Sequence, residues 1–136
     1  MSCKTPTSNP PVDVSAAVLI VDDQDYFRGV LRDLVQATPG FELVGEAASG
    51  EEALEAAERV SPSLVIIDKR MPGIGGIETC RRLVERDPDV VVVITSIEDP
   101  DPRVAQECGA AAFLRKQELS PRRLEALWRE HRPQPA

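Results

Sequence analysis

VIIDKRMPGIGGIE, residues 65–78, joins a short apolar run to an aspartate, a loop and the start of a helix. The apolar run, residues 64–67, is short and continuous, as expected of a parallel strand that is covered on both faces. Asp68 follows at once, and a loop rich in Gly and Pro separates it from apolar residues at helical spacing, namely Ile77, Cys80, Leu83 and Val84. The stretch therefore predicts one βα unit with a carboxylate at the carboxyl end of its strand.

Three further apolar runs lie on either side of this unit, and each leads into reactive polar residues. Residues 16–21 lead into Asp22 and Asp23, residues 90–94 into Thr95 and Ser96, and residues 110–114 into Lys116. Apolar residues at helical spacing separate the runs, and residues 41–47 read as a further strand. This alternation is typical of βαβ units, so we predict an α/β fold with five βα units around a parallel sheet.

Capping and stop signals define the expected helix boundaries. They are an N-cap at Asp25 with a stop at Pro39 and Gly40, a capping box at Ser49 and Glu52, and an N-cap at Ser120 followed by Pro121. The two prolines in residues 97–102 delay the fourth helix until about Asp101. We therefore expect that helix to be short, with Gly109 at its end.

Length and composition favour one ordinary globular domain. The chain has 136 residues, of which 42% are hydrophobic and 29% are charged. We expect a disordered tail over residues 1–15, a folded domain over residues 16–132 and a short tail over residues 133–136. The net charge of −7 argues against direct binding of nucleic acid, which requires Lys and Arg to neutralise phosphates.

The three cysteines and the apolar runs define the expected compartment. Cys3, Cys80 and Cys108 form no CxxC pair, so neither a disulfide framework nor a zinc site is expected, and Cys80 and Cys108 are expected in the core. No apolar stretch approaches the roughly 18 residues that span a bilayer, and the amino terminus lacks the order of a signal peptide. A cytoplasmic protein without membrane contact is the expectation.

The polar residues at the strand ends predict a single site. Carboxyl ends of parallel strands lie along one edge of a sheet, where open α/β sheets bind their ligands. That edge would carry three carboxylates, hydroxyl groups and an ammonium group. Such a set could hold a divalent cation and receive a phosphoryl group.

The order VLIVDDQ, VIIDKRMPGIGGIE, VVVITS and AFLRKQ resembles the receiver domain of bacterial two-component response regulators. The resemblance covers about residues 16–131, and the DD pair, the D-x-x-MPG-x-x-G motif, the Thr and the Lys each stand at a predicted strand end. It implies a flavodoxin-like, doubly wound, five-stranded parallel sheet of order 2-1-3-4-5 with five helices. The strand order follows from the resemblance and not from the apolar runs.

The resemblance also assigns roles to residues. Asp68 is expected to be the phosphorylation site, and Mg²⁺ is the expected cofactor, because it takes hard oxygen ligands. The implied metal ligands are Asp23 directly, Asp22 mainly through water, Asp68, and the backbone carbonyl of Arg70. The implied phosphate-binding and switch residues are Thr95, Ser96, Lys116 and Phe113, with Thr95 moving toward the phosphate and Phe113 turning inward. Three carboxylates this close would raise the pKa of at least one of them unless a cation lay among them.

The expected partners follow from the same roles. The phosphoryl group would come from a phosphohistidine on a sensor histidine kinase or a phosphotransfer protein. A downstream effector protein would bind the face made by the fourth helix, the strand at residues 110–114 and the last helix. The chain is expected to be a stand-alone receiver and no enzyme beyond its own phosphorylation and dephosphorylation, and a phosphorylation-dependent dimer stays open.

One position departs from the family pattern, and three other functions stay open. Gln117 stands where many receivers have a proline with a cis bond, so we expect a trans bond there.

A metal-dependent phosphohydrolase of the haloacid-dehalogenase type would need an aspartate at position 70, where this chain has arginine. The alternatives within the resemblance are an unphosphorylated pseudo-receiver that only binds partners, and the receiver fragment of a regulator with a DNA-binding output domain. The side chains of Lys69 and Arg70 are expected to be solvated.

Overall fold

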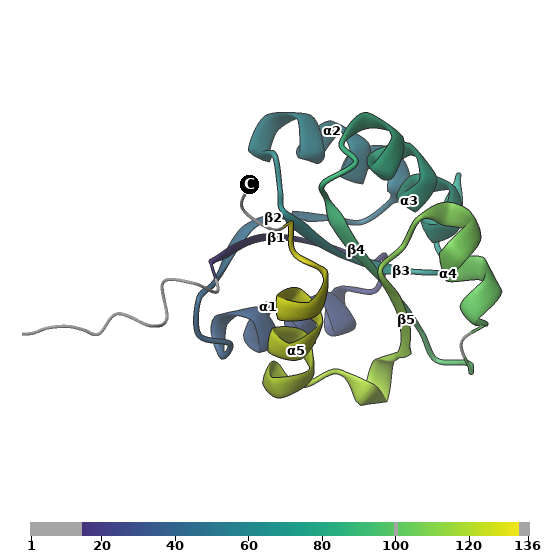
Figure 1. The fold of residues 1–136 in the computed structure, drawn as a ribbon. Helices are drawn as coiled ribbons and strands as arrows, with labels where there is room; N and C mark the ends of the chain where they lie inside the picture. Colours follow the sequence, from purple (N-terminus) through teal and green to yellow (C-terminus); the bar gives the residue numbers. More distant parts are fainter. Residues whose placement is uncertain (1–14, 100, 134–136) are drawn as a thin grey trace, which may run out of the picture.

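Five parallel strands form one sheet in the order β2-β1-β3-β4-β5 (Figure 1). The computed structural model describes residues 15–99 and 101–133. Along the chain the elements are β1 Ala16–Val21, α1 Asp25–Gln36, β2 Phe41–Ala47, α2 Gly50–Val60, β3 Leu64–Asp68, α3 Gly75–Arg86, β4 Val91–Ser96, α4 Pro102–Cys108, β5 Ala112–Arg115, a 3₁₀ turn Lys116–Glu118, and α5 Pro121–His131. The predicted doubly wound α/β fold with five helices is confirmed.

Some of the predictions from sequence fall on residues that lie outside the described ranges. These are the two expected tails, apart from Ser15 and Pro133, together with Cys3 and Pro100. Within the described ranges, no helix combines the length and the apolar character that crossing a membrane requires.

The central strands are short and apolar because both of their faces are covered. Every residue of β3 and of β4 is buried, whereas β2, at the edge of the sheet, is mostly half-buried. In the register of the sheet, Val21 of β1 lies beside Ile67 of β3, and Asp68 lies beside Thr95 of β4. The carboxyl ends of β1, β3 and β4 therefore meet at one edge, as the sequence predicted.

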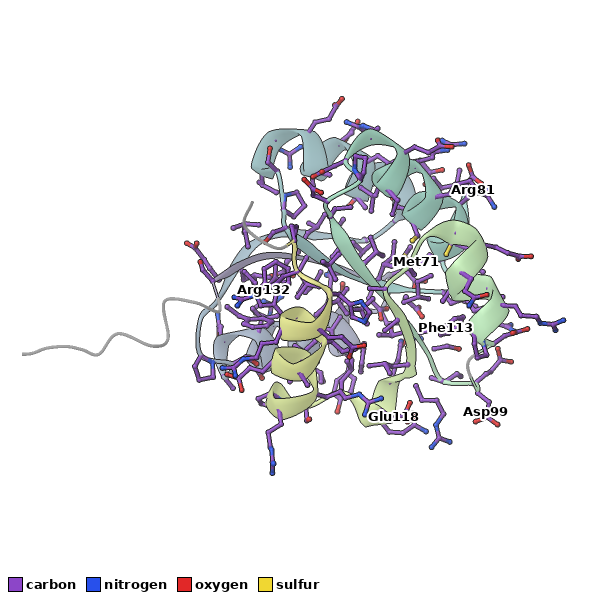
Figure 2. The ribbon with its side chains drawn as sticks, in the orientation of Figure 1. Met71, Arg81, Asp99, Phe113, Glu118 and Arg132 are labelled. Carbon is purple, nitrogen blue, oxygen red and sulfur yellow. The ribbon has the colours of Figure 1, made fainter. Side chains whose placement is uncertain are left out.

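The helices form one layer on each face of the sheet (Figure 1). Helices α2, α3 and α4 cover the face that receives Val65 and Ile67, and α1 and α5 cover the face that receives Leu64 and Ile66. Side chains alternate along a strand, so consecutive residues of β3 supply two separate cores. Phe113 of β5 belongs to the core under α4 and is labelled beside that helix in Figure 2.

Most helix boundaries follow the predicted signals. Ser120 accepts a hydrogen bond from the N–H of Arg123, and Pro121 is the first residue of α5. Helix α4 has only seven residues and ends at Gly109, whose φ of 83° lies in the left-handed region that favours glycine. The predicted short fourth helix is confirmed.

Two capping predictions need correction. The N-cap of α1 is Gln24 rather than Asp25, because Asp22 accepts the N–H of Gln24 and turns the chain one residue earlier. At α2, the hydroxyl of Ser49 accepts the N–H of Glu52 as expected, but the Glu52 carboxylate reaches back to the N–H of Ala48. Only the first half of the capping box is therefore formed as predicted.

Gly76 brings the start of α3 against the end of β3. A Cβ atom at this position would lie 2.1 Å from the carbonyl oxygen of Asp68, and the Gly76 N–H donates to the carbonyl of Lys69 over 3.0 Å. Only a residue without a side chain fits there. The close approach fixes the backbone on both sides of the Asp68 side chain.

The two described cysteines lie in the core between α3 and α4. Cys80 and Cys108 are buried, and the Cys80 thiol donates to the carbonyl oxygen of Cys108 over 3.4 Å. Burial, and then the neighbouring Cys108, raise the pKa of the Cys80 thiol. A thiol with a raised pKa is a poor nucleophile, which agrees with the predicted packing role.

Candidate functional site

Three carboxylates meet at the carboxyl edge of the sheet. Asp22 and Asp23 follow β1 and Asp68 ends β3, and each offers an oxygen within 4.8 Å of the others. Asp22 and Asp68 are buried, while Asp23 is exposed. The sequence predicted that these three residues would come together, and the structure places them together.

Lys116 lies directly against this acidic cluster, which we define as Asp22, Asp23 and Asp68. Its Nζ is 3.0 Å from Oδ2 of Asp22 and 3.7 Å from Oδ2 of Asp68. The same nitrogen lies over the ring of Phe27, 4.2 Å from the ring centroid, and the lysine side chain is only 10% exposed. Ion pairs and the aromatic ring thus hold the ammonium group at the cluster.

The oxygen atoms of the acidic cluster suit a divalent cation. Oδ1 of Asp22 accepts the N–H of Gln24, but Oδ2 is buried and accepts no hydrogen bond from the described residues, although Lys116 lies within ion-pair distance. A buried carboxylate oxygen without a hydrogen bond costs free energy unless another positive group satisfies it. Two buried carboxylates and an exposed one offer the oxygen ligands that Mg²⁺ prefers. A ligand role for the backbone carbonyl of Arg70 stays a prediction.

Asp68 is the carboxylate whose protonation is most affected by its surroundings. Burial, and then the negative charge of Asp22, raise its pKa to about 6, while Lys116 and a backbone hydrogen bond from Arg70 act in the opposite direction. The cluster therefore carries an acid that keeps its proton to a higher pH than an ordinary aspartate does.

This raised pKa predicts a pH-dependent stability that a metal ion removes. Folded Asp68 keeps its proton to about pH 6, whereas an unfolded aspartate loses it near its ordinary value of 3.8, so the group's contribution to stability falls as the pH rises between these values. With EDTA present, we expect the free energy of unfolding of the wild type to fall by about 1 kcal/mol from pH 5 to pH 7.5, relative to Asp68→Asn. Urea unfolding at the two pH values measures this difference.

Saturating Mg²⁺ is the internal control for that measurement, because a cation favours the ionised carboxylate and should abolish the difference. An unfolding free energy that changes with pH equally in the wild type and in Asp68→Asn would contradict the prediction.

The two hydroxyl residues at the end of β4 lie in the expected place and bond to the backbone. Thr95 is fully buried beside Asp68, and its hydroxyl donates to the carbonyl of Ile67 over 3.4 Å. The Ser96 hydroxyl accepts the N–H of Glu98. Their roles in phosphate binding stay predictions.

The side chains that follow Asp68 differ from one another. Arg70 is exposed as expected, and its guanidinium pairs with Glu98 over 2.7 Å. Lys69 is half-buried rather than fully solvated, because its ammonium group lies 5.7 Å from the centroid of the Phe113 ring. Phe113 itself is buried, and whether it moves stays a prediction.

The loop after Lys116 contains no cis bond, as predicted; all peptide bonds of the described ranges are trans. Lys116 opens a 3₁₀ turn that ends at Glu118, and the Glu118 carboxylate accepts the N–H of Arg115 over 2.8 Å. Figure 2 labels Glu118 and Asp99 on the loops at this edge of the molecule. A side-chain hydrogen bond therefore shapes the loop that contains Gln117.

Two residues of the first turn of α1 also shape the site. Phe27 carries the ammonium group of Lys116 on its ring, and Arg28 donates to the carbonyl of Asp22 over 2.8 Å. The helical spacing assigned Phe27 to the core, and nothing in the sequence singled out Arg28. Only its position three residues after Asp25, at the spacing of neighbours on one helix face, could have indicated its ion pair with that aspartate.

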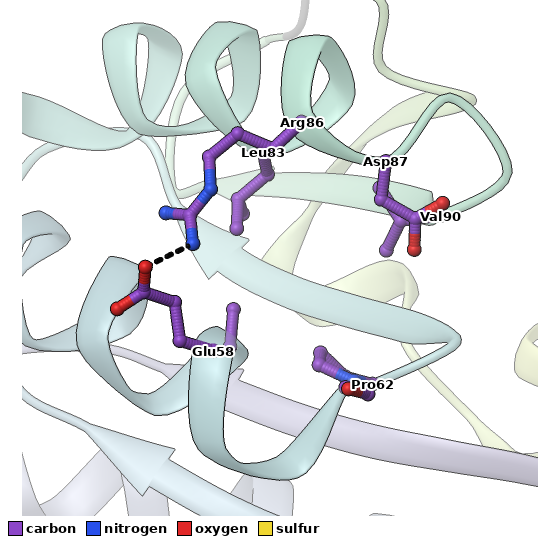
Figure 3. Close-up of a pocket in the computed structure, with 8 residues that line it drawn as sticks. Glu58, Pro62, Leu83, Arg86, Asp87 and Val90 are labelled. Atoms are coloured by element: carbon purple, nitrogen blue, oxygen red, sulfur yellow. Dashed lines mark ion pairs between the residues drawn. The ribbon is translucent and has the colours of Figure 1, made fainter.

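A pocket between α2 and α3 lies away from this site (Figure 3). It has a volume of about 440 Å³, and Glu58 and Arg86 form an ion pair of 2.8 Å between α2 and α3. Pro62 and Val90, which also line it, precede β3 and β4, so the pocket is at the opposite end of the strands from Asp68. None of the predicted site residues lines it, and the acidic cluster is the candidate site.

Comparison with known proteins gives one consistent result. A family model described as "Response regulator receiver domain" matches residues 18–129. Response regulator GacA of Pseudomonas viridiflava is 41% identical over 101 residues, which are 73% of this chain and 47% of that protein. Transcriptional regulatory protein DegU of Brevibacillus brevis is 34% identical over 102 residues, 74% of this chain and 43% of that protein. The chain thus spans less than half the length of these curated relatives.

A solved structure agrees with the same family. The two-component response regulator of the LuxR family from Aurantimonas sp. SI85-9A1 superposes with a TM-score of 0.77 at 30% identity. The match covers 87% of this chain and 88% of that one.

Proposed function

The chain belongs to the response regulator receiver domain family, and on that premise we propose that Asp68 accepts a phosphoryl group from a phosphohistidine and thereby switches a protein surface. One observation carries the proposal. Asp68 lies beside two further aspartates that could hold Mg²⁺ and beside a lysine whose Nζ is 3.7 Å from its carboxylate. The function that this arrangement supports best is that of a signalling module which is reversibly phosphorylated.

In the proposed transfer, a carboxylate oxygen of Asp68 attacks the phosphorus atom and forms the acyl phosphate bond. The phosphorus–nitrogen bond of the donor histidine breaks, and the imidazole leaves with the electron pair of that bond. Ionised Asp68 is the reactive form; its raised pKa increases the protonated share, and a bound cation would favour the ionised form again.

Asp23, Asp22, Asp68 and the backbone carbonyl of Arg70 are the groups that would hold Mg²⁺. Bound there, Mg²⁺ neutralises charge on the phosphoryl oxygens, which is the main catalytic need of phosphoryl transfer. Lys116 would contact the same oxygens as a point charge, because the Phe27 ring and Asp22 already hold its ammonium group at the site. The hydroxyls of Thr95 and Ser96 would donate to them.

The proposed output follows from the position of Thr95. Its hydroxyl now donates to the carbonyl of Ile67 over a long 3.4 Å, so a phosphoryl oxygen is a stronger competing acceptor. Movement of Thr95 toward Asp68 would change the packing around Phe113 and α4, and with it the surface of α4, β5 and α5. The proposed partners are a sensor histidine kinase or phosphotransfer protein and a downstream effector, in the cytoplasm where the kinase has access to ATP.

Labelling by a small phosphodonor tests this proposal. Incubation with acetyl phosphate and Mg²⁺ should give one alkali-labile, hydroxylamine-sensitive phosphoryl group per chain, detected by intact mass spectrometry. Chelation of Mg²⁺ with EDTA should prevent it. Absence of labelling with Mg²⁺ present would favour the pseudo-receiver function, in which the domain binds partners without phosphorylation.

A second candidate function is the receiver part of a transcriptional regulator. The observation that favours it is the coverage of the relatives, because the chain spans 47% of GacA and 43% of DegU, which is described as a transcriptional regulatory protein. In that case the switched surface would act on an output module with its own DNA-binding site. The reading frame around the coding region distinguishes an attached output module from a separate effector.

A further inference from the structure

We propose that Arg28 is a positioning residue for the acidic cluster: it fixes the peptide unit between Asp22 and Asp23 so that both carboxylates face the same cation. The inference rests on the proposed function, because it concerns the residues that would hold Mg²⁺. It assigns a task to a residue that touches neither the cation nor the phosphoryl group.

The Arg28 guanidinium contacts the acidic loop at two points. Nη1 donates to the carbonyl oxygen of Asp22 over 2.8 Å, and Nη2 forms an ion pair with the carboxylate of Asp25. The arginine side chain is only 18% exposed and its bond to the Asp22 carbonyl is partly buried, whereas the Asp25 carboxylate is 91% exposed. A guanidinium is planar and presents several donors in a fixed fork, which suits one group that binds several acceptors.

Glu46 of β2 forms a further ion pair with Arg28. Its Oε1 lies 3.5 Å from Nε of Arg28, and Arg32 donates to both of its oxygens over 2.7 and 2.8 Å. The hydrogen bond from Arg32 lowers the pKa of Glu46, so this glutamate is ionised. The guanidinium of Arg28 is therefore held by Glu46 of β2, and it in turn holds the backbone at the end of β1.

The backbone of Asp22 is fixed on both sides by these contacts. Its N–H donates to the carbonyl of Ala47 over 3.1 Å, and its own carbonyl accepts from Arg28. That carbonyl belongs to the peptide unit that leads into Asp23. Among the described residues, no hydrogen bond or ion pair holds the exposed carboxylate of Asp23, so the backbone from which it projects is what sets its position relative to Asp22.

Charge and positioning predict opposite effects of removing Arg28. The positively charged guanidinium of Arg28 lies close to the acidic cluster and repels Mg²⁺. Loss of this charge by itself would therefore strengthen metal binding. Loss of the fixed peptide unit would weaken it, because Asp23 would no longer be preorganised. The sign of the change therefore separates the two effects.

The test is the Mg²⁺ affinity of Arg28→Ala, measured by isothermal titration calorimetry on the whole chain. We expect the dissociation constant to rise about tenfold, at the lower end of what the loss of an outer-shell partner costs. Arg32→Ala is the matched control, since it lies on the same helix and binds the same glutamate but does not touch Asp22. Its exposed ion pair should leave the dissociation constant within about twofold of the wild type.

Arg28→Lys keeps the charge and removes the fork, so it should bind Mg²⁺ more weakly than the wild type and more tightly than Arg28→Ala. Thermal unfolding with and without Mg²⁺ supplies a second readout, in which Arg28→Ala should gain less from the metal than Arg32→Ala does. Equal or tighter Mg²⁺ binding by either Arg28 variant would overturn the inference. A wild-type chain that binds no Mg²⁺ would instead overturn the metal site of the proposed function.

Discussion

Asp68→Asn is expected to abolish labelling by acetyl phosphate. The amide is nearly isosteric with the carboxylate and can keep the backbone hydrogen bond, but its nitrogen and oxygen are poor nucleophiles and form no acyl phosphate. Although Asp68 is buried at the end of a buried strand, the similar shape of the amide should leave the fold intact. Intact mass spectrometry after incubation with Mg²⁺ and acetyl phosphate should show only unmodified protein.

Asp33→Asn is the control for that experiment, because it removes an exposed carboxylate of α1 outside the acidic cluster. It should be labelled like the wild type. Labelling of Asp68→Asn to a similar extent would show that another group accepts the phosphoryl group and would end the proposed function. Circular dichroism of both variants verifies that they are folded.

Gly76→Ala is expected to destabilise the fold strongly. The new Cβ would lie 2.1 Å from the carbonyl oxygen of Asp68 and 2.9 Å from Cα of Lys69, which are backbone atoms that no rotamer change can move. The start of α3 or the end of β3 must therefore shift, and we expect a loss of about 3 kcal/mol or more in the free energy of unfolding. Urea unfolding measures the loss.

Gly29→Ala provides the matched comparison within a helix. A Cβ there would meet only the end of the flexible Arg32 side chain, at 3.8 Å, and alanine is the better helix former. That variant should gain about 0.5–1 kcal/mol. If the two variants were equally stable, the contact between Gly76 and the end of β3 would not constrain the fold. A shifted β3 end should also slow the labelling of Asp68, because its carboxylate would leave the cluster.

The sequence predicted the fold well where a continuous apolar run left only one interpretation. The apolar runs at residues 64–67 and 90–94 contribute to buried strands, because a strand covered by helices on both faces shields every side chain of a continuous apolar run from water. The order of the strands depended on the resemblance, since βαβ patterns alone do not say which strands are neighbours. The strand boundaries moved by one or two residues, because hydrogen bonding continues past the apolar run, as at Asp68 and Ser96.

The candidate site divides in the same way. The acidic cluster and Lys116 could be predicted, because parallel strands bring their carboxyl ends to one edge. Phe27 and Arg28 could not, because their roles depend on the angle at which α1 leaves the sheet. The N-cap at Asp25 was wrong for a related reason: the Asp22 side chain captures the N–H of Gln24 first, and a sequence does not rank two neighbouring aspartates for that bond.

Helix α4 has a length that the chain cannot change. Pro102 lacks the N–H with which a helix could be extended backwards, and Gly109 has already turned into the left-handed region at the other end. Two turns of helix are too short to be stable by themselves, so α4 depends on the packing of Ala105 and Cys108. A signal that reaches this part of the surface can therefore displace α4 as a rigid rod or melt it, but it cannot lengthen the helix or slide its register. Under the proposed function, a partner protein would therefore recognise one of two positions of a helix of fixed length, or the folded helix as opposed to its unfolded segment.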